Sequence, residues 1–231
     1  MDFSHFDTRK YPTVSVQYGY GEWAKTYEDT VLEAMDFRLL ERIRSIQWDQ
    51  IQWAADLACG TGRIGAWLKQ KGVKSLDGVD LTPEMLGVAE AKGIYQRLLQ
   101  EDITSTSLEV ESYDLVTAVL VDEHLPEVRS LYREAARITK PHGYFVIVGY
   151  HPSFLMSGIP THFDRMTGES VTIECYVHLC SDHVNAALAA GWSLMEMHEG
   201  LIDEEWIAKK PKWSQYANRP ISFAMVWQKK G

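Results

Sequence analysis

The chain has 231 residues, of which 45% are hydrophobic and 24% charged, and its formal net charge at pH 7 is −9. This composition indicates a globular domain, and the acidic balance with scattered basic residues disfavours a nucleic-acid partner, which is usually bound by a basic stripe. There is no apolar run of about 18 residues, no basic and apolar leader and no disulfide-type cysteine spacing, so we expect no membrane partner and a cytoplasmic protein.

The first predicted element is an amphipathic helix within residues 20–46. Its apolar positions are spaced as on one face of a helix: Val31, Leu32, Met35, Leu39, Leu40 and Ile43. We treat residues 1–46 as a helical cap on a single domain that covers residues 1–231. We also expect residues 1–28 to act as a lid that closes over a bound ligand.

A glycine-rich turn follows between a predicted strand, residues 51–58, and a predicted helix, residues 63–71. The turn reads Gly60-x-Gly62-x-x-Gly65, and it is preceded by Asp56. Such turns bind either a dinucleotide, whose pyrophosphate sits at the helix N-terminus, or S-adenosylmethionine (SAM). A carboxylate would repel phosphate but would favour the ammonium and sulfonium of SAM, so Asp56 favours the second interpretation.

The next strand and helix place further acids at strand ends. A strand over residues 74–80 ends at Asp80, where a carboxylate can accept hydrogen bonds from both hydroxyls of a ribose. Thr82 and Pro83 then open a helix that ends near Gly93. After a third strand, residues 95–100, the pair Asp102 and Ile103 can bind the amino group of an adenine and cover its ring.

Two more strands, residues 113–121 and the end of 138–148, continue the alternation of strands and helices. This alternation predicts a parallel sheet with helices on both faces. Residues 151–180 break the rhythm with prolines and glycines, and we interpret them as an insertion on the substrate side that contains a strand over residues 171–179. A helix near residues 181–191 and two strands, residues 192–200 and 221–228, complete the prediction.

Taken together, Asp56-x-x-x-Gly60-x-Gly62, Asp80 and Asp102-Ile103 resemble the motifs of the class I SAM-dependent methyltransferases. The resemblance covers roughly residues 20–150 and includes Trp23-Ala24-x-x-Tyr27, which is similar to a segment that caps SAM in that family. It implies an α/β, Rossmann-like sheet of seven strands, mostly parallel, with the last strand antiparallel. The cofactor-binding residues that it implies are Tyr27, Asp56, Ala58, Gly60, Gly62, Asp80, Leu81, Asp102 and Ile103.

The end of the fourth strand, Val121-Asp-Glu-His-Leu-Pro126, lacks the Asn/Asp-Pro-Pro-Tyr/Phe signature of amino-methylating DNA enzymes. Together with the acidic charge, this favours a small-molecule acceptor that is methylated on O, N or C. Histidines are the candidate bases because their pKa lies near neutrality. The first choice is His124, and His162 and His178 follow; Tyr176 and His178 would share one strand face.

No metal is expected, because the spacing of His151, His162, Asp164 and His178 matches no compact zinc pattern. Two alternatives to the methyltransferase remain open at this stage. One is an NAD(P)-dependent oxidoreductase, which rests on the glycine loop and Asp80. The other is a domain that binds SAM without catalysis. The sequence does not indicate an oligomeric state.

Overall fold

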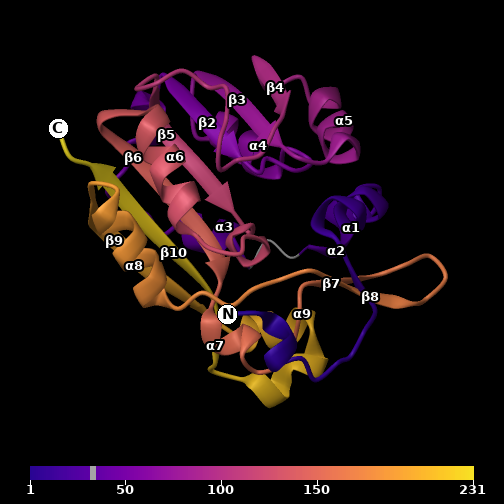
Figure 1. Cartoon of the computed structure of the whole chain (residues 1–231). Helices are drawn as coiled ribbons and strands as arrows, with labels where there is room; N and C mark the ends of the chain where they lie inside the picture. Colours follow the sequence, from indigo (N-terminus) through magenta and orange to yellow (C-terminus); the bar gives the residue numbers. More distant parts are fainter. Residues whose placement is uncertain (32–34) are drawn as a thin grey trace.

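A seven-stranded sheet forms the centre of the computed structural model, which describes residues 1–31 and 35–231 (Figure 1). The strand order is β4-β3-β2-β5-β6-β10-β9, and every neighbouring pair is parallel except the two that involve β10. The strands are β2 (Trp53–Leu57), β3 (Ser75–Asp80), β4 (Arg97–Gln100), β5 (Tyr113–Val119), β6 (Thr139–Tyr150), β9 (Trp192–Leu201) and β10 (Pro220–Lys229). The predicted Rossmann-like sheet with an antiparallel last strand is confirmed.

Helices cover both faces of this sheet. On one face α6 (Arg129–Ile138) and α8 (Cys180–Ala189) bury a core that includes Trp192 and Trp227. On the other, α3 (Phe37–Leu40) and α4 (Arg63–Gln70) bury a core that includes Trp67 and Leu68, while α5 (Pro83–Ala91) follows β3. Since both faces are covered, the central strands are apolar on both sides, which is why they read as continuous hydrophobic runs in the sequence.

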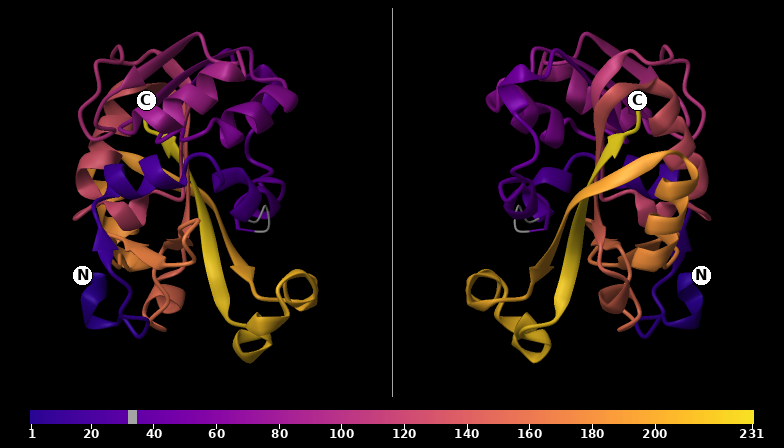
Figure 2. Two further views of the ribbon diagram at one scale, coloured as in Figure 1. Left: turned by 90° about the vertical axis from the view of Figure 1, so that its right-hand side faces the viewer. Right: turned by 90° about the vertical axis from the view of Figure 1, so that its left-hand side faces the viewer.

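A second layer lies beyond the carboxyl ends of the parallel strands (Figures 1 and 2). It contains a small sheet of order β1-β8-β7, in which β1 and β8 are parallel and β7 and β8 antiparallel. Its elements are η1 (Phe3–His5), β1 (Thr13–Val14), α1 (Val16–Trp23), α2 (Tyr27–Thr30), α7 (Pro152–Leu155), β7 (His162–Asp164), β8 (Ser170–Ile173), α9 (Glu204–Lys209) and η4 (Pro211–Tyr216). The N-terminal segment and the segment after β6 therefore form one structural layer. In Figure 2 the long β9–β10 hairpin reaches the same region and carries α9 at its far end.

The single helix expected within residues 20–46 is wrong. Three short helices, α1, α2 and α3, stand there, and residue Leu32 of the predicted apolar face lies outside the described residues. The apolar positions serve two different cores: Met35 packs with the second layer, whereas Leu39 and Leu40 pack against the central sheet. One straight helix cannot present its face to both cores.

The strand expected over residues 171–179 is present as β8, but its predicted end is wrong, because β8 ends at Ile173. From Tyr176 on, the backbone forms hydrogen bonds with segments outside the small sheet. The Tyr176 N–H donates to the Glu123 carbonyl at 2.6 Å, and the Val177 N–H donates to the Met1 carbonyl at 2.7 Å. Tyr176 and His178 consequently do not share a strand face.

Within residues 1–31 and 35–231, no helix has the length and apolar character needed to cross a membrane.

Candidate functional site

A cavity of about 250 Å³ lies where β2, β3 and β5 end, under the cover of α1 and α2. Crevices at the carboxyl ends of parallel strands are the usual ligand sites of open α/β sheets. Most of the residues predicted from the sequence line this cavity: Tyr27, Ala58, Gly60, Asp80, Leu81, Asp102, Ile103 and His124. Asp56, Gly62, His162 and His178 are absent from its walls among the described residues.

Asp80 organises the polar side of the cavity. Its carboxylate is only 9% exposed; Oδ2 accepts the Gly60 N–H and Oδ1 accepts the Thr82 N–H, both at 2.8 Å. The side chain thus ties the glycine loop to the start of α5. Burial raises the pKa of Asp80, and these backbone donors partly offset that effect. Each carboxylate oxygen keeps a free lone pair for a ligand hydroxyl.

Left-handed backbone conformations shape the floor of the cavity. Gly60 has a φ of +53°, and a Cβ at this position would meet no atom within 4 Å, so the backbone stands open to a ligand. Ala58 and Leu120 also have positive φ values, 57° and 55°, although they are not glycines. Strained residues of this kind concentrate at functional sites. No sequence signal points to Leu120, which the sequence-based prediction missed.

Asp56 is buried close to the glycine loop and does not line the cavity. It is 1% exposed, and its two oxygens accept hydrogen bonds from the Tyr95 and Thr117 hydroxyls, both at 2.8 Å. Burial raises the pKa of Asp56 to about 6, and the two hydroxyl donors oppose that rise. Because Asp56 does not line the cavity among the described residues, its side chain acts on the glycine loop through Tyr95.

The other two glycines of the loop make room for Tyr95. A Cβ on Gly65 would lie 2.2 Å from the Tyr95 hydroxyl oxygen, and one on Gly62 would lie 3.1 Å from the Tyr95 ring. The motif Gly60-x-Gly62-x-x-Gly65 therefore combines one glycine that faces the cavity with two that permit close packing beneath it.

Replacing Gly65 with alanine is expected to destabilise the protein by roughly 1–3 kcal/mol, because the new methyl group must push Tyr95 away from Asp56. Urea unfolding measures the change. The matched control is Gly87→Ala in α5, where a Cβ meets nothing within 4 Å and the helical propensity of alanine should stabilise by about 0.5–1 kcal/mol. Equal stabilisation by both substitutions would contradict the packing role of Gly65.

His124 lies in the turn η3 (Asp122–His124), directly after β5, and is 7% exposed. Its Nδ1 lies 2.7 Å from the Glu174 carbonyl oxygen, which can only accept, so Nδ1 carries the proton. Nε2 is then the acceptor for the Tyr20 hydroxyl at 2.8 Å. Burial lowers the pKa of His124 to about 4. The cavity wall thus holds a neutral imidazole of fixed tautomer with a phenol bonded to it.

The pKa of His124 predicts an acid-sensitive contribution to stability. Between its ordinary pKa of 6.5 and about 4, the unfolded chain binds a proton that the folded chain does not, so stability falls as the pH falls. Relative to a His124→Gln variant, the wild type should lose about 2 kcal/mol between about pH 7.5 and pH 5. The raised pKa of Asp56 makes stability rise as the pH falls. Asp56 is present in both proteins, so its effect cancels in the comparison. Urea unfolding at the two pH values tests this, and parallel losses in both proteins would contradict it.

His162 and His178 lie elsewhere. The His178 Nε2 donates to the Leu125 carbonyl at 2.8 Å, and burial lowers the pKa of this histidine. It supports the segment after η3 from outside the cavity. The His162 Nδ1 donates to the Pro160 carbonyl at 2.8 Å, and the ring lines a second cavity described below. The part of the chain that the structure describes contains no group of three or more His, Cys, Asp or Glu residues able to hold a metal ion.

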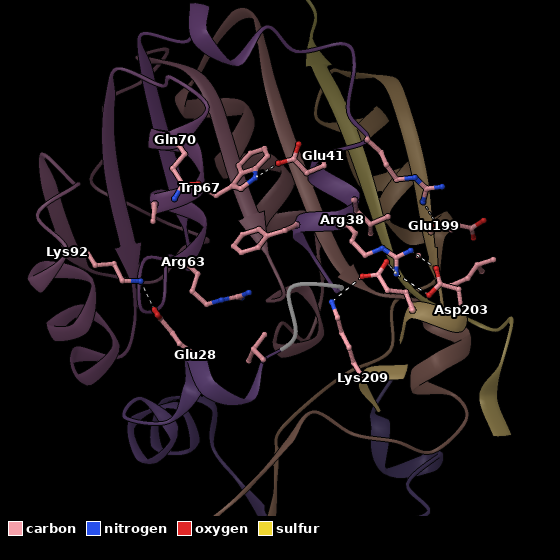
Figure 3. A pocket seen from close by; sticks show the side chains of 18 residues that line it. Glu28, Arg38, Glu41, Arg63, Trp67, Gln70, Lys92, Glu199, Asp203 and Lys209 are labelled. Atoms are coloured by element: carbon pink, nitrogen blue, oxygen red, sulfur yellow. Dashed lines mark hydrogen bonds and ion pairs between the residues drawn. The ribbon is translucent and has the colours of Figure 1, made fainter. Parts of the chain in front are cut away.

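A larger hollow, of about 950 Å³, is also lined by the described residues (Figure 3). It lies between α3, α4 and the end of β9. Its charged groups are largely paired with one another: Figure 3 shows Lys92 against Glu28 and Arg38 against Asp203, with Arg63 between them. Since most of its polar groups are already satisfied, size alone does not make this hollow the functional site.

The chain is similar to methyltransferases both in sequence and in fold. A family model described as a methyltransferase domain matches residues 55–147. The chain is 23% identical to an uncharacterized methyltransferase of Emericella nidulans, and the match covers 90% of this chain and 88% of that protein. It is 30% identical to a ubiquinone biosynthesis O-methyltransferase of Azoarcus sp., with 48% of this chain and 52% of the relative covered, so it spans about half of that enzyme. Among solved structures, a SAM-dependent methyltransferase from Mesorhizobium loti has 20% identity and a TM-score of 0.66, over 87% of this chain and 99% of that one.

Proposed function

Since this chain belongs to the class I SAM-dependent methyltransferases, we propose that it transfers a methyl group to an oxygen of a small-molecule acceptor. The cofactor is SAM, and the dinucleotide interpretation of the glycine loop no longer stands. The single observation that carries the proposal is the cavity over β2, β3 and β5, which gathers Asp80, Ile103 and His124 from separate parts of the sequence.

The residues of this cavity fit SAM. Asp80 would bind the ribose hydroxyls through its remaining lone pairs, while Asp102 and Ile103 would bind the adenine. The open backbone at Gly60 and the ring of Tyr27 would flank the methionine end. When bound, SAM supplies an electrophilic methyl group on a positively charged sulfur. The protein's main contribution to such an in-line displacement is to orient the two reactants.

Two features support a small acceptor and an oxygen nucleophile. The cavity is covered by α1 and α2, through Val16, Tyr20 and Tyr27, which leaves little room for a macromolecule. In addition, curated relatives of this chain include O-methyltransferases that are named for ubiquinone biosynthesis. We also propose that residues 151–180, together with the N-terminal segment, form the substrate side of one domain.

His124 and Tyr20 provide a path for the proton that the acceptor hydroxyl loses. With SAM bound, the acceptor proton would pass to the Tyr20 oxygen as Tyr20 gives its own proton to His124 Nε2. The bond between the acceptor oxygen and the methyl carbon would form as the bond between that carbon and the sulfur breaks, with S-adenosylhomocysteine as the leaving group. Burial raises the pKa of Tyr20, so this phenol is protonated in the resting protein and ready to donate. The Glu123 carboxyl, 3.6 Å from Nε2, stands beside the imidazolium that results.

The test is a methyl-transfer assay with isotopically labelled SAM and a panel of small phenols, amines and carbon acids, with transfer RNA and a histone peptide alongside. We expect S-adenosylhomocysteine and a methylated phenol as products. Methylation confined to amines would overturn the oxygen assignment, and methylation confined to either macromolecule would overturn the small-molecule acceptor.

A further inference from the structure

A second cavity, of about 380 Å³, lies in the layer beyond the carboxyl ends of the strands. Three segments far apart in the sequence form its walls. Trp23 comes from α1, Tyr150 and Phe154 from the end of β6 and from α7, and Trp206 and Trp213 from the connection between β9 and β10. The catalytic scheme above uses none of these side chains.

The aromatic rings of this cavity are arranged in stacks. Phe154 stacks between Tyr150, at a centroid distance of 5.7 Å, and Trp213, at 5.3 Å. On a second wall Trp23 stacks on Phe163 at 5.5 Å, with an interplanar angle of 14°. Flat aromatic walls suit a planar ring, and polar groups beside them can fix its orientation.

One cluster of aromatic side chains borders both this cavity and the cofactor cavity. Tyr20 and Tyr27 line the cofactor cavity, whereas Trp23 lines the second one. The Trp23 ring lies 5.9 Å from Tyr20 and 5.0 Å from Tyr27, measured between centroids. A ligand in the second cavity is therefore a neighbour of the cofactor and of the Tyr20–His124 pair.

The buried side-chain group that lacks a partner in this cavity is a donor. Trp206 is 2% exposed, and its Nε1–H meets no acceptor among the described residues. Lys210 and Lys212 also line the cavity, and neither lies within 4.0 Å of a described carboxylate oxygen. Burial and the neighbouring Lys212 lower the pKa of Lys210, as expected for a cation without a counter-ion.

The wall also contains acids and one histidine. Asp29 and Asp164 are exposed, and Asp164 accepts a hydrogen bond from the Ser170 hydroxyl at 2.5 Å. His162 is half-buried and bonded to the Pro160 carbonyl. The deepest polar group, the Trp206 indole, is thus a donor, and the cations without partners stand on the chain segment that follows it.

We infer that this cavity binds the methyl acceptor, and that the acceptor is a planar aromatic acid whose ring lies between the aromatic walls and whose carboxylate meets Lys210 and Lys212. The methylation of this ligand rests on the proposed function, but its binding requires only the cavity. Aromatic walls also attract organic cations, yet two lysines without counter-ions disfavour a cation here.

The experiment measures the binding of three probes without SAM, by isothermal titration calorimetry and by quenching of tryptophan fluorescence. The probes are 4-hydroxybenzoate, 4-hydroxybenzyl alcohol and tyramine, which share a phenol ring and differ in charge. We expect the acid to bind at least about tenfold more tightly than the alcohol, a difference of ~1.4 kcal/mol. The double variant Lys210→Gln/Lys212→Gln should reduce the affinity for the acid to that for the alcohol and leave the alcohol unaffected. The matched control is Lys209→Gln, since Lys209 is paired with Glu205 and does not line this cavity.

Equal affinities of acid and alcohol, tighter binding of tyramine, or no binding of the acid would each overturn the inference. The proposed function fails in a different way. Tight, lysine-dependent binding of the acid together with an absence of any methyl transfer would contradict the methylation scheme and uphold the cavity assignment. Methylation of small phenols that does not depend on the two lysines would uphold the proposed function and contradict the assignment of this cavity.

Discussion

Replacing Asp80 with alanine is expected to weaken SAM binding at least about 100-fold. The carboxylate offers charge-assisted hydrogen bonds to two ribose hydroxyls, and each such bond contributes roughly 1.5–3 kcal/mol. The substitution also removes the acceptor for the Gly60 and Thr82 N–H groups, so the glycine loop and the start of α5 lose their connection. Both effects act on the same cavity.

Calorimetric titration with SAM and with S-adenosylhomocysteine measures this loss. Asp80→Asn provides a milder variant, since its amide oxygen still accepts one of the two backbone donors, and it should retain an intermediate affinity. Glu90→Gln, on the exposed side of α5, is the control and should bind as the wild type does. If folded Asp80→Ala bound SAM with wild-type affinity, the cofactor would not use this carboxylate.

The second large effect is expected on catalysis when the Tyr20–His124 pair is broken. His124→Gln and Tyr20→Phe should each reduce kcat by about 100-fold or more for a phenolic acceptor, in the range that general-base catalysis usually contributes. The tautomer set by the Glu174 carbonyl leaves Nε2 as the only acceptor on the imidazole, and Tyr20 is the donor that meets it.

A histidine outside the cavity gives the matched control for this second prediction. In His178→Gln the amide can still donate to the Leu125 carbonyl, so kcat should stay within about threefold of the wild type. Similar kcat losses in His124→Gln and His178→Gln would indicate a structural effect. Unchanged kcat in both His124→Gln and Tyr20→Phe would remove the pair from the mechanism.

The central sheet could be predicted from the sequence because its signals are local. Gly62 marks the start of α4, Pro83 stands at the first position of α5, and Asp80 ends β3 as expected. Glycine and proline mark these helix starts through their backbone preferences, and the acid marks a strand end by its position directly after an apolar run. For that reason, the cavity residues at those strand ends were also found in advance.

The N-terminal cap and the insertion over residues 151–180 were expected, but their pairing into one layer could not be predicted, because it is built from contacts between distant parts of the chain. Thr13 pairs with Thr172, and the Met1 carbonyl accepts from Val177. The contact between Asp56 and Tyr95 could not be predicted for a similar reason: the two residues are 39 positions apart, and only the packing of Gly65 against the Tyr95 ring reveals it. Tyr20 was noted only as one of several aromatic residues, since nothing in the sequence pairs it with His124.

A crystal structure of the complex with S-adenosylhomocysteine would locate the cofactor, because both the cavity at the strand ends and the larger hollow between α3, α4 and β9 are open to a ligand. We expect the ribose on the Asp80 carboxylate and the adenine beside Asp102 and Ile103, in the smaller cavity at the carboxyl ends of β2, β3 and β5. A ligand bound in the larger hollow among Arg38, Arg63 and Lys92 would contradict it.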